Sequence, residues 1–283
     1  MKYGIGEMQK LSLTKTVGPN DPTTVCNFLA EFTALSKSRV KDAMAKGAVW
    51  LKKQKGKQHR CRRATAGLRP GDILSIYYDK ALLSKSPALP ELISDQGRYS
   101  VWVKPAGLMA QGTKYGDHCS LLRQAALYFE SKRKLYLIHR LDREAAGLVL
   151  LAHDKTAAGR LSRLFQKQWI VKRYTAKVLG NLTDTLPGNK IDLALDGKSA
   201  LTEIAVDHYD QETFTSKVYI VIRTGRKHQI RRHFEMIGHP VMGDPRYGEG
   251  NKNKEGMQLA ATALEFQCPF NQKKLVFEYT SGL

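Results

Sequence analysis

Residues 139–154 read HRLDREAAGLVLLAHD, and this stretch joins a charged loop to an uninterrupted apolar run. Three basic side chains crowd around one carboxylate, Asp142, and GLVLLA follows at residues 147–152. A short apolar run of this kind is typical of a buried strand. The stretch therefore predicts a strand in the core, preceded by a loop that holds Asp142 either as a surface ion pair or as a group that does chemistry.

The charge balance of the chain favours polyanionic partners. Its 283 residues include 46 Lys and Arg against 26 Asp and Glu, a formal net charge of +20. Such an excess attracts nucleic acid first and anionic membrane second. The apolar runs are far shorter than the ~18 residues of a spanning helix, and MKYGIGEMQK at the start lacks the apolar core of a signal peptide. We therefore expect a cytoplasmic protein, outside the membrane and monomeric.

Signatures of several other reaction classes are missing. The four cysteines are far apart, which predicts neither a disulfide framework nor a cysteine metal site. We find no phosphate-binding glycine loop and no GxSxG elbow. The spacings of five and six residues between His228, His233 and His239, beside Asp244, do not match a metal-binding helix face. We therefore predict no metal and no nucleotide cofactor.

The N-terminal part is predicted to be a small, basic α/β domain, residues 1–79. Apolar spacing between residues 25 and 44 indicates two short helices, with Ser36 as the N-cap of the second, and strands follow. Between Lys37 and Arg63 there are eleven Lys and Arg and one Asp, 11 − 1 = +10. A solvated face is one interpretation, and contact with nucleic acid is the favoured one. The candidate RNA-binding residues here are Arg39, Lys52, Lys53, Lys55, Lys57, Arg60, Arg62 and Arg63.

A linker at 80–89 is predicted to lead to a second domain, residues 90–283. Alternating apolar residues predict strands at 91–95, 99–103, 135–139, 147–154, 173–180, 202–210, 216–223 and 275–280. Helices are expected at 119–130, 154–168 and 227–237. This order indicates an α+β fold built on a mostly antiparallel, mixed sheet.

The segment RTGRKHQIRRHF at 223–234 is the densest basic cluster of this domain, with no acid. As a helix, it would place Lys227, Arg231 and Glu235 on one face, and the turn before it would aim backbone N–H groups at an anion. A carboxylate close to arginine stays ionised and can act as a nucleophile. The residues alone therefore indicate a protein that acts on RNA or DNA through Asp142, or one that only binds.

Four segments together resemble the RluA-type family of RNA pseudouridine synthases, in the order found in that family. HRLDREAAGLVLLAHD is similar to HRLDxxTSGLLLLAK, and VWVKPAGL (101–108) to a strand that ends in NKPAGL. KRYTAKVLG (172–180) resembles KxYxAxVxG, and residues 224–248 resemble TGRTHQIRxHxxxxGHPIxGDxxYG. Residues 22–79 resemble, more weakly, a small RNA-binding module named after a small-subunit ribosomal protein.

The resemblance implies that the base of a uridine is cut from its ribose, rotated and rejoined through carbon 5, without cofactor or metal. Asp142 would be the nucleophile, acting on the anomeric carbon through a glycal, or acting on the base. Tyr174 would stack on the base or serve as general base. Arg231 would pair with Asp142, with Arg226 as the alternative. His139, Arg140, Arg226, Lys227 and His228 are the candidate RNA contacts of this domain.

The sequence departs from the family pattern at Ala145 and Ala146, where Thr-Ser is usual, and at Val103, where Asn is usual. These changes keep open a second hypothesis, a non-catalytic RNA-binding or ribosome-assembly protein on the same scaffold. A DNA-binding regulator has only charge in its favour. The basic N-terminal domain favours structured RNA, rRNA more than tRNA, as the partner.

Overall fold

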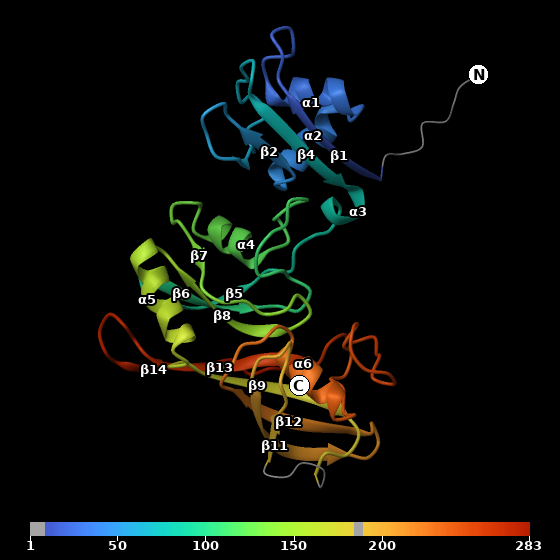
Figure 1. Cartoon of the computed structure of the whole chain (residues 1–283), viewed down its shortest axis with the longest axis vertical. Coiled ribbons are helices and arrows are strands. Elements are labelled where there is room, and N and C mark those ends of the chain that lie inside the picture. Colours follow the sequence, from blue (N-terminus) through green and yellow to red (C-terminus); the bar gives the residue numbers. More distant parts are fainter. Residues whose placement is uncertain (1–8, 184–188) are drawn as a thin grey trace, which may run out of the picture. The chain divides into compact units, whose positions relative to one another are not determined.

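The computed structural model describes residues 9–183 and 189–283 (Figure 1). Residues 1–8, most of the stretch read for a signal peptide, lie outside the described residues. The chain divides into two compact units. The first runs to Pro87 and includes Gln111–Gln124; the second comprises Ala88–Ala110 and Ala125–Leu283. Among the described residues, no helix has the length and apolarity to cross a membrane.

The first unit is a four-stranded antiparallel sheet with two short helices. The strand order is β1 (Lys10–Thr16), β4 (Ile73–Asp79), β2 (Val49–Lys52) and β3 (His59–Arg60). Helices α1 (Val25–Thr33) and α2 (Lys37–Ala45) bury Phe28 and Met44 in one cluster with Leu74 and Ile76 of β4. The Ser36 side chain accepts from the Arg39 N–H, so the predicted N-cap is confirmed. Strand β1 was not predicted, and one helical turn, α3 (Lys80–Leu83), opens the predicted linker.

The second unit is built on one large sheet. Its main path runs β10 (Lys190–Asp192), β11 (Leu201–Asp210), β12 (Thr215–Ile222), β9 (Val171–Leu179), β13 (Leu259–Gln267), β8 (Ala146–Ala152), β6 (Tyr99–Lys104) and β5 (Glu91–Asp95). Strand β14 (Lys274–Glu278) pairs with β13, and β7 (Tyr136–Leu137) with β8. Of the described pairs, only β13 with β8 is parallel. The expected α+β fold with a mostly antiparallel, mixed sheet is confirmed.

Strand β13 joins the two halves of this sheet, and the sequence did not predict it. Ala261 pairs with Gly147 of β8 on one side and with Tyr174 of β9 on the other. Gly147 has φ +114°, and a Cβ at this position would overlap the backbone of Ala261. The register therefore aligns the start of β8, just after Asp142, with Tyr174, and this alignment requires glycine at 147.

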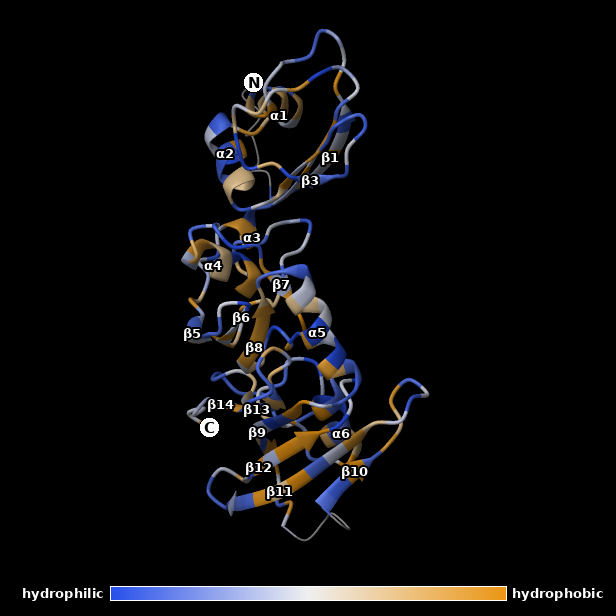
Figure 2. Cartoon of the chain, turned by 90° about the vertical axis from the view of Figure 1, so that its left-hand side faces the viewer, coloured by the Kyte–Doolittle hydropathy of each residue, from blue (hydrophilic) through white to orange (hydrophobic). Residues whose placement is uncertain are grey.

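Helix α5 (Lys155–Gln166) covers the half of the sheet that contains β8. Its buried residues Ala157, Leu161 and Leu164 share a cluster with Leu148 and Leu150 of β8. Figure 2 shows β8 coloured hydrophobic along its length, as expected for a strand buried on both faces. The helices expected at 119–130 and 227–237 are found as α4 (Leu121–Tyr128) and α6 (Gln229–Met236).

Candidate active site

Asp142 and Arg231 meet in the second unit. Asp142 lies in the loop before β8, and Arg231 comes from α6, 89 residues later. The Arg231 Nη1 donates to Asp142 Oδ2 at 2.8 Å. Arg226, the alternative partner, instead donates its Nε to the carbonyl of Ser199 at 3.1 Å. Arg231 is therefore the arginine that pairs with Asp142.

The helix that carries Arg231 differs from the sequence expectation. Arg231 is only 3% exposed, whereas Glu235, expected on the same face, is exposed. Lys227 precedes the helix and is exposed. The Arg226 N–H, expected to face an anion, donates to Gln229 Oε1 at 3.1 Å. The basic cluster is therefore divided between a buried ion pair and a solvated turn, because the apolar face that includes Ile230 and Phe234 draws Arg231 inward.

Asp244 fixes the Arg231 guanidinium from the other side. Its Oδ2 accepts from Nε at 2.6 Å and its Oδ1 from Nη2 at 2.8 Å. The backbone N–H groups of Arg246 and Tyr247 also donate to Asp244 Oδ1, at 2.8 and 3.1 Å. A two-point pair of this kind sets the plane of the guanidinium. Arg231 is thereby oriented so that Nη1 points to Asp142.

Arg231 and Asp244 each favour the ionised form of the other. Burial lowers the pKa of Arg231, but the hydrogen bonds to Asp244 and Asp142 outweigh burial and raise it. Burial raises the pKa of Asp244, but the hydrogen bonds from Arg231, Arg246 and Tyr247 bring it below the ordinary value. Both members of the buried pair therefore stay ionised at neutral pH.

A pocket of about 110 Å³ opens at Asp142. Tyr174, Ile222 and Leu259 line it together with Ala145, one of the residues that depart from the family pattern. Burial raises the pKa of Tyr174, and the charge of Asp142 raises it further. The phenol therefore stays protonated at neutral pH, which favours stacking on a base over service as a general base.

His228 also contacts this carboxylate. Its Nε2 lies 3.6 Å from Asp142 Oδ1, and its Nδ1 shares a hydrogen bond of 2.9 Å with the Tyr247 hydroxyl. Burial lowers the pKa of His228, although Asp142 acts in the opposite direction. The imidazole is therefore neutral at physiological pH, and its hydrogen bond to Tyr247 fixes the ring beside the pocket.

Lys104 holds the loop that carries Asp142. Its side chain is fully buried, and its three N–H groups are shared among the carbonyls of Pro105, Leu108, Arg143 and Ala145, which lie 2.6 to 3.2 Å from Nζ. Burial lowers the pKa of Lys104 to about 8, against the opposing charges of Glu144 and Asp142. The ammonium therefore ties the end of β6 to the residues that follow Asp142.

The other predicted contacts of this unit take different positions. Arg140, Arg226 and His228 line the pocket at Asp142. His139 accepts from the Leu150 N–H through Nε2 at 3.1 Å and stacks on Phe165 with ring centroids 4.3 Å apart. Burial lowers the pKa of His139 to about 3, and the charge of Lys172 lowers it further. Neutral His139 therefore braces the loop, and an RNA contact by it stays a prediction.

In the first unit, several predicted RNA-binding cations have protein partners. Lys53 donates to Asp72 at 2.8 Å. Arg60 stacks on Trp50 and pairs with Asp117 at 3.2 Å, and Arg62 pairs with the same carboxylate at 2.5 Å. Lys52, Lys55, Lys57, Arg39 and Arg63 have exposed side chains. Exposed lysines are therefore the residues of this unit best placed to reach RNA.

The three spaced histidines face different groups. His233 is buried, with Nδ1 against the Thr202 hydroxyl and Nε2 against the Leu193 carbonyl, at 2.9 and 3.0 Å. His239 Nδ1 contacts the Leu179 carbonyl at 2.8 Å. Across residues 9–183 and 189–283, no three side chains of His, Cys, Asp or Glu are grouped to hold a metal.

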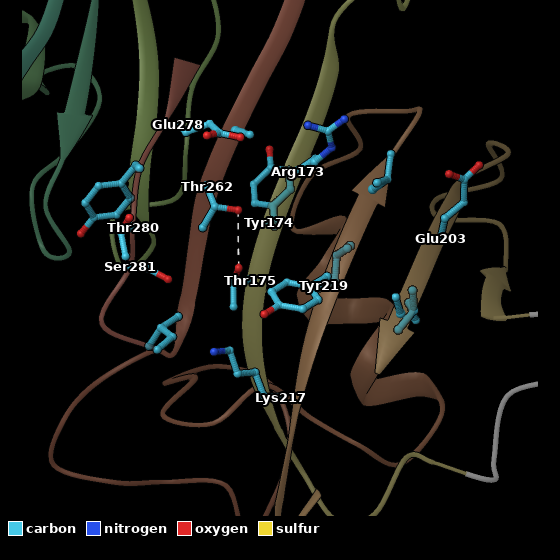
Figure 3. A pocket seen from close by; sticks show the side chains of 17 residues that line it. Arg173, Tyr174, Thr175, Glu203, Lys217, Tyr219, Thr262, Glu278, Thr280 and Ser281 are labelled. Atoms are coloured by element: carbon cyan, nitrogen blue, oxygen red, sulfur yellow. Dashed lines mark hydrogen bonds between the residues drawn. The ribbon is translucent and has the colours of Figure 1, made fainter. Parts of the chain in front are cut away.

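A larger hollow, about 510 Å³, lies beside β9, β11, β12 and β13 of the same sheet (Figure 3). Arg173, Tyr174 and Thr175 of β9 line it, and Tyr174 also lines the pocket at Asp142. Lys217 and Tyr219 face it from β12, and Thr262 from β13. Glu203 and Glu278 balance its two cations, and neither Asp142 nor Arg231 reaches it. The smaller pocket is therefore the candidate active site.

Comparisons with known proteins point to one family. A family model described as RNA pseudouridylate synthase matches residues 98–236. An RNA pseudouridine synthase of Aquifex aeolicus is 30% identical, covering 89% of this chain and 88% of its own. The dual-specificity RNA pseudouridine synthase RluA of Vibrio parahaemolyticus is 30% identical over 59% of this chain and 73% of its own. The human RNA pseudouridylate synthase domain containing 1 shares the fold, with a TM-score of 0.57 and 24% identity over 68% of this chain and 83% of its own.

Proposed function

The chain belongs to the RNA pseudouridine synthases and is an isomerase that acts on RNA; from this premise we propose that Asp142 is its nucleophile and that its target is a uridine of structured rRNA. One observation supports the first part most. Asp142 is held by the fixed, buried Arg231 at a pocket whose wall includes Tyr174. The exposed lysines of the first unit support a structured RNA as the partner.

The pocket suits a single base that has left its stack. Enzymes that act on a base extrude it and hold it between aromatic and apolar side chains. Tyr174 offers an aromatic ring, and Ile222 and Leu259 offer apolar walls. The target uridine would therefore come from a loop or be flipped out of a helix, because paired bases cannot reach Asp142.

The proposed reaction conserves every atom. The bond between ribose C1′ and uracil N1 breaks, and the base leaves with the bonding electrons. In this form the Asp142 carboxylate acts as a base and takes the C2′ proton, which gives a glycal. After the base turns, its C5 attacks C1′ while C2′ regains the proton. The C5 proton then leaves and N1 takes up a proton, which gives the product. Arg231 supports this role because its Nη1 donates to Asp142 Oδ2 and orients the carboxylate.

Direct attack of Asp142 on C1′ is the second form of the mechanism. It uses the same carboxylate and the same ion pair, and the base again leaves through N1. Both forms require the C5 proton to leave, so both release tritium from C5-labelled uridine. Neither requires a cofactor or metal.

The test is tritium release from C5-labelled, unmodified rRNA and tRNA. We expect release by the native protein, reduced at least ~10³-fold in Asp142→Asn. Asp207→Asn, a carboxylate change on β11, is the matched control and should retain activity. The labelled pool that reacts identifies the RNA class, and reaction with tRNA alone would contradict the rRNA assignment.

Absence of release by the native protein, with RNA binding intact, would support the non-catalytic scaffold. Ala145 would then be the first residue to restore, because it lines the pocket where the family pattern has threonine. Equal tritium release by the native protein and Asp142→Asn would contradict only the role of Asp142 and would leave the reaction itself in place.

A further inference from the structure

A second hollow adjoins the candidate active site. It measures about 440 Å³, within the ~300–1,000 Å³ range of ligand sites. Arg140, Tyr174, Ile222, Gly225 and Arg226 line both this hollow and the pocket at Asp142. A chain that places a uridine in the pocket would therefore pass directly into the hollow.

The buried cation Lys172 points to the ligand of this hollow. Lys172 lines it from β9, two residues before Tyr174, and is only 9% exposed. Its Nζ has one weak hydrogen bond, 3.4 Å, to the Thr224 carbonyl. Within the described chain it forms no ion pair with a carboxylate. A buried charge is costly unless it is paired, so this site lacks an anion.

The other described residues that line the hollow supply no counter-charge to Lys172. Burial lowers the pKa of the Lys172 ammonium. The charge of Lys172 also lowers the pKa of His139, a neighbour in the same hollow. Arg140, Arg223 and Arg226 complete the lining, and no described lining residue is acidic.

We infer that this hollow is a second nucleotide subsite, in which Lys172 binds a backbone phosphate of the RNA next to the target uridine. The inference deepens the proposed function and rests on it for the identity of the neighbouring nucleotide. Phosphate is the fitting anion because the family acts on RNA and lysine binds phosphate as a point charge.

Three other lining residues suit the base of that nucleotide. Phe165 lines the hollow and is stacked on His139, and the exposed Gln166 and Gln168 also line it. Aromatic faces stack on any base, and amides hydrogen-bond to base edges. The subsite would therefore bind the phosphate of one nucleotide by charge. The two glutamines would add a preference for particular bases at that position.

The test compares Lys172→Met with Lys172→Arg in binding to a fluorescent oligouridylate of about nine nucleotides. For single strands the slope of log affinity against log salt changes by ~0.7 for each phosphate contact. We expect Lys172→Met to reduce this slope by ~0.7 and Lys172→Arg to retain it. Lys177→Met is the matched control, because Lys177 lies on β9 with its side chain on the other face.

Thermal unfolding without RNA separates binding from a structural role. Because Lys172 is a buried, unpaired charge, Lys172→Met should have an unchanged or higher Tm. A lower Tm with an unchanged slope would make Lys172 a structural residue and overturn the inference. If Lys172→Met does not fold, Lys172→Gln serves in the same comparison.

Binding and chemistry distinguish the two proposals. If the native protein releases tritium but the salt dependence of RNA affinity is the same for the native protein and Lys172→Met, only the subsite proposal is overturned. A reduced slope without tritium release would retain the subsite and overturn the proposed reaction.

Discussion

Arg231 divides its donors between two carboxylates. Nε and Nη2 serve the buried Asp244, and Nη1 serves Asp142. Asp244 does not line the pocket, so it is a positioning residue that acts through Arg231. Its loss leaves the guanidinium charged, buried and free to rotate away from Asp142.

We predict that Asp244→Ala lowers the free energy of unfolding by about 3–5 kcal/mol, the effect of breaking a buried pair. Asp244→Asn should fold and should lower kcat more than it raises KM. Asp196→Asn is the control: Asp196 forms the same two-point pair with Arg232, but on the surface. Exposed pairs contribute at most about 1 kcal/mol. Equal destabilisation of the two pairs in chemical denaturation would contradict this prediction.

The same pair predicts a pH dependence of stability. The pKa of Asp244 is lowered in the folded state, whereas an unfolded aspartate has a pKa of about 3.9. Its carboxylate therefore stabilises the fold above that pH, and the contribution is lost as the pH falls through the folded value. The stability difference between the native protein and Asp244→Asn should shrink in acid, as measured by urea unfolding between about pH 6 and 3. A constant difference would exclude this charge effect.

Lys104 is a second residue that acts at a distance. Lys104→Met removes hydrogen bonds to four carbonyls and should destabilise the fold by about 2–4 kcal/mol. The loop with Asp142 should loosen, so tritium release should fall as well. Lys190→Met, on exposed β10, should change stability by less than about 0.5 kcal/mol. Full activity of Lys104→Met would show that the loop does not depend on this ammonium.

At the residue scale, the sequence predicted the pair of Asp142 and Arg231 but not Asp244, which orients Arg231. Asp142 stood out as one acid among bases, and the family pattern named Arg231. Asp244 was considered only as a metal ligand, although it is the one acid in a rigid loop after a basic helix. Lys172 could not be found, because burial without a partner depends on residues distant in sequence.

Strand β13 shows why element prediction failed in one place. LAATALEFQ contains three alanines and does not alternate clearly, so its composition favours a helix. It is a strand because Ala260 and Ala261 let the backbone approach Gly147 closely. The helices expected at 154–168 and 227–237 were found as α5 and α6, because their apolar faces have helical spacing.

We predict that Gly147→Ala lowers the free energy of unfolding by at least about 3 kcal/mol and abolishes activity, because the new Cβ would separate β8 from β13. Gly197→Ala is a matched control. Gly197 also has positive φ, +71°, but no atom lies within 4 Å of its Cβ position, so only about 1 kcal/mol is expected. Denaturant unfolding of the two variants tests this, and equal losses would show that φ alone matters.

At the scale of the whole molecule, the exposed lysines of residues 52–57 and Asp142 lie in different units. We predict that Lys52, Lys55 and Lys57 changed together to Ala weaken RNA binding and reduce the salt slope by about 2. The kcat on saturating RNA should not change, because none of these lysines belongs to the unit with Asp142. Alanine at Lys155, Lys190 and Lys254, exposed in the second unit, is the control. An unchanged slope in binding titrations would assign RNA contact elsewhere.

The position of β13 also bears on how the protein is made. Because the chain is made from its N-terminus, β8 and β9 leave the ribosome before β12, α6 and β13. In the finished sheet, however, β13 lies between β8 and β9. A nascent chain that has not reached codon 259 has no strand to join Asp142 to Tyr174. Domains fold as their sequence emerges, but this candidate active site forms only after β13 has emerged. The growing polypeptide should therefore be unable to modify the ribosome that is translating it.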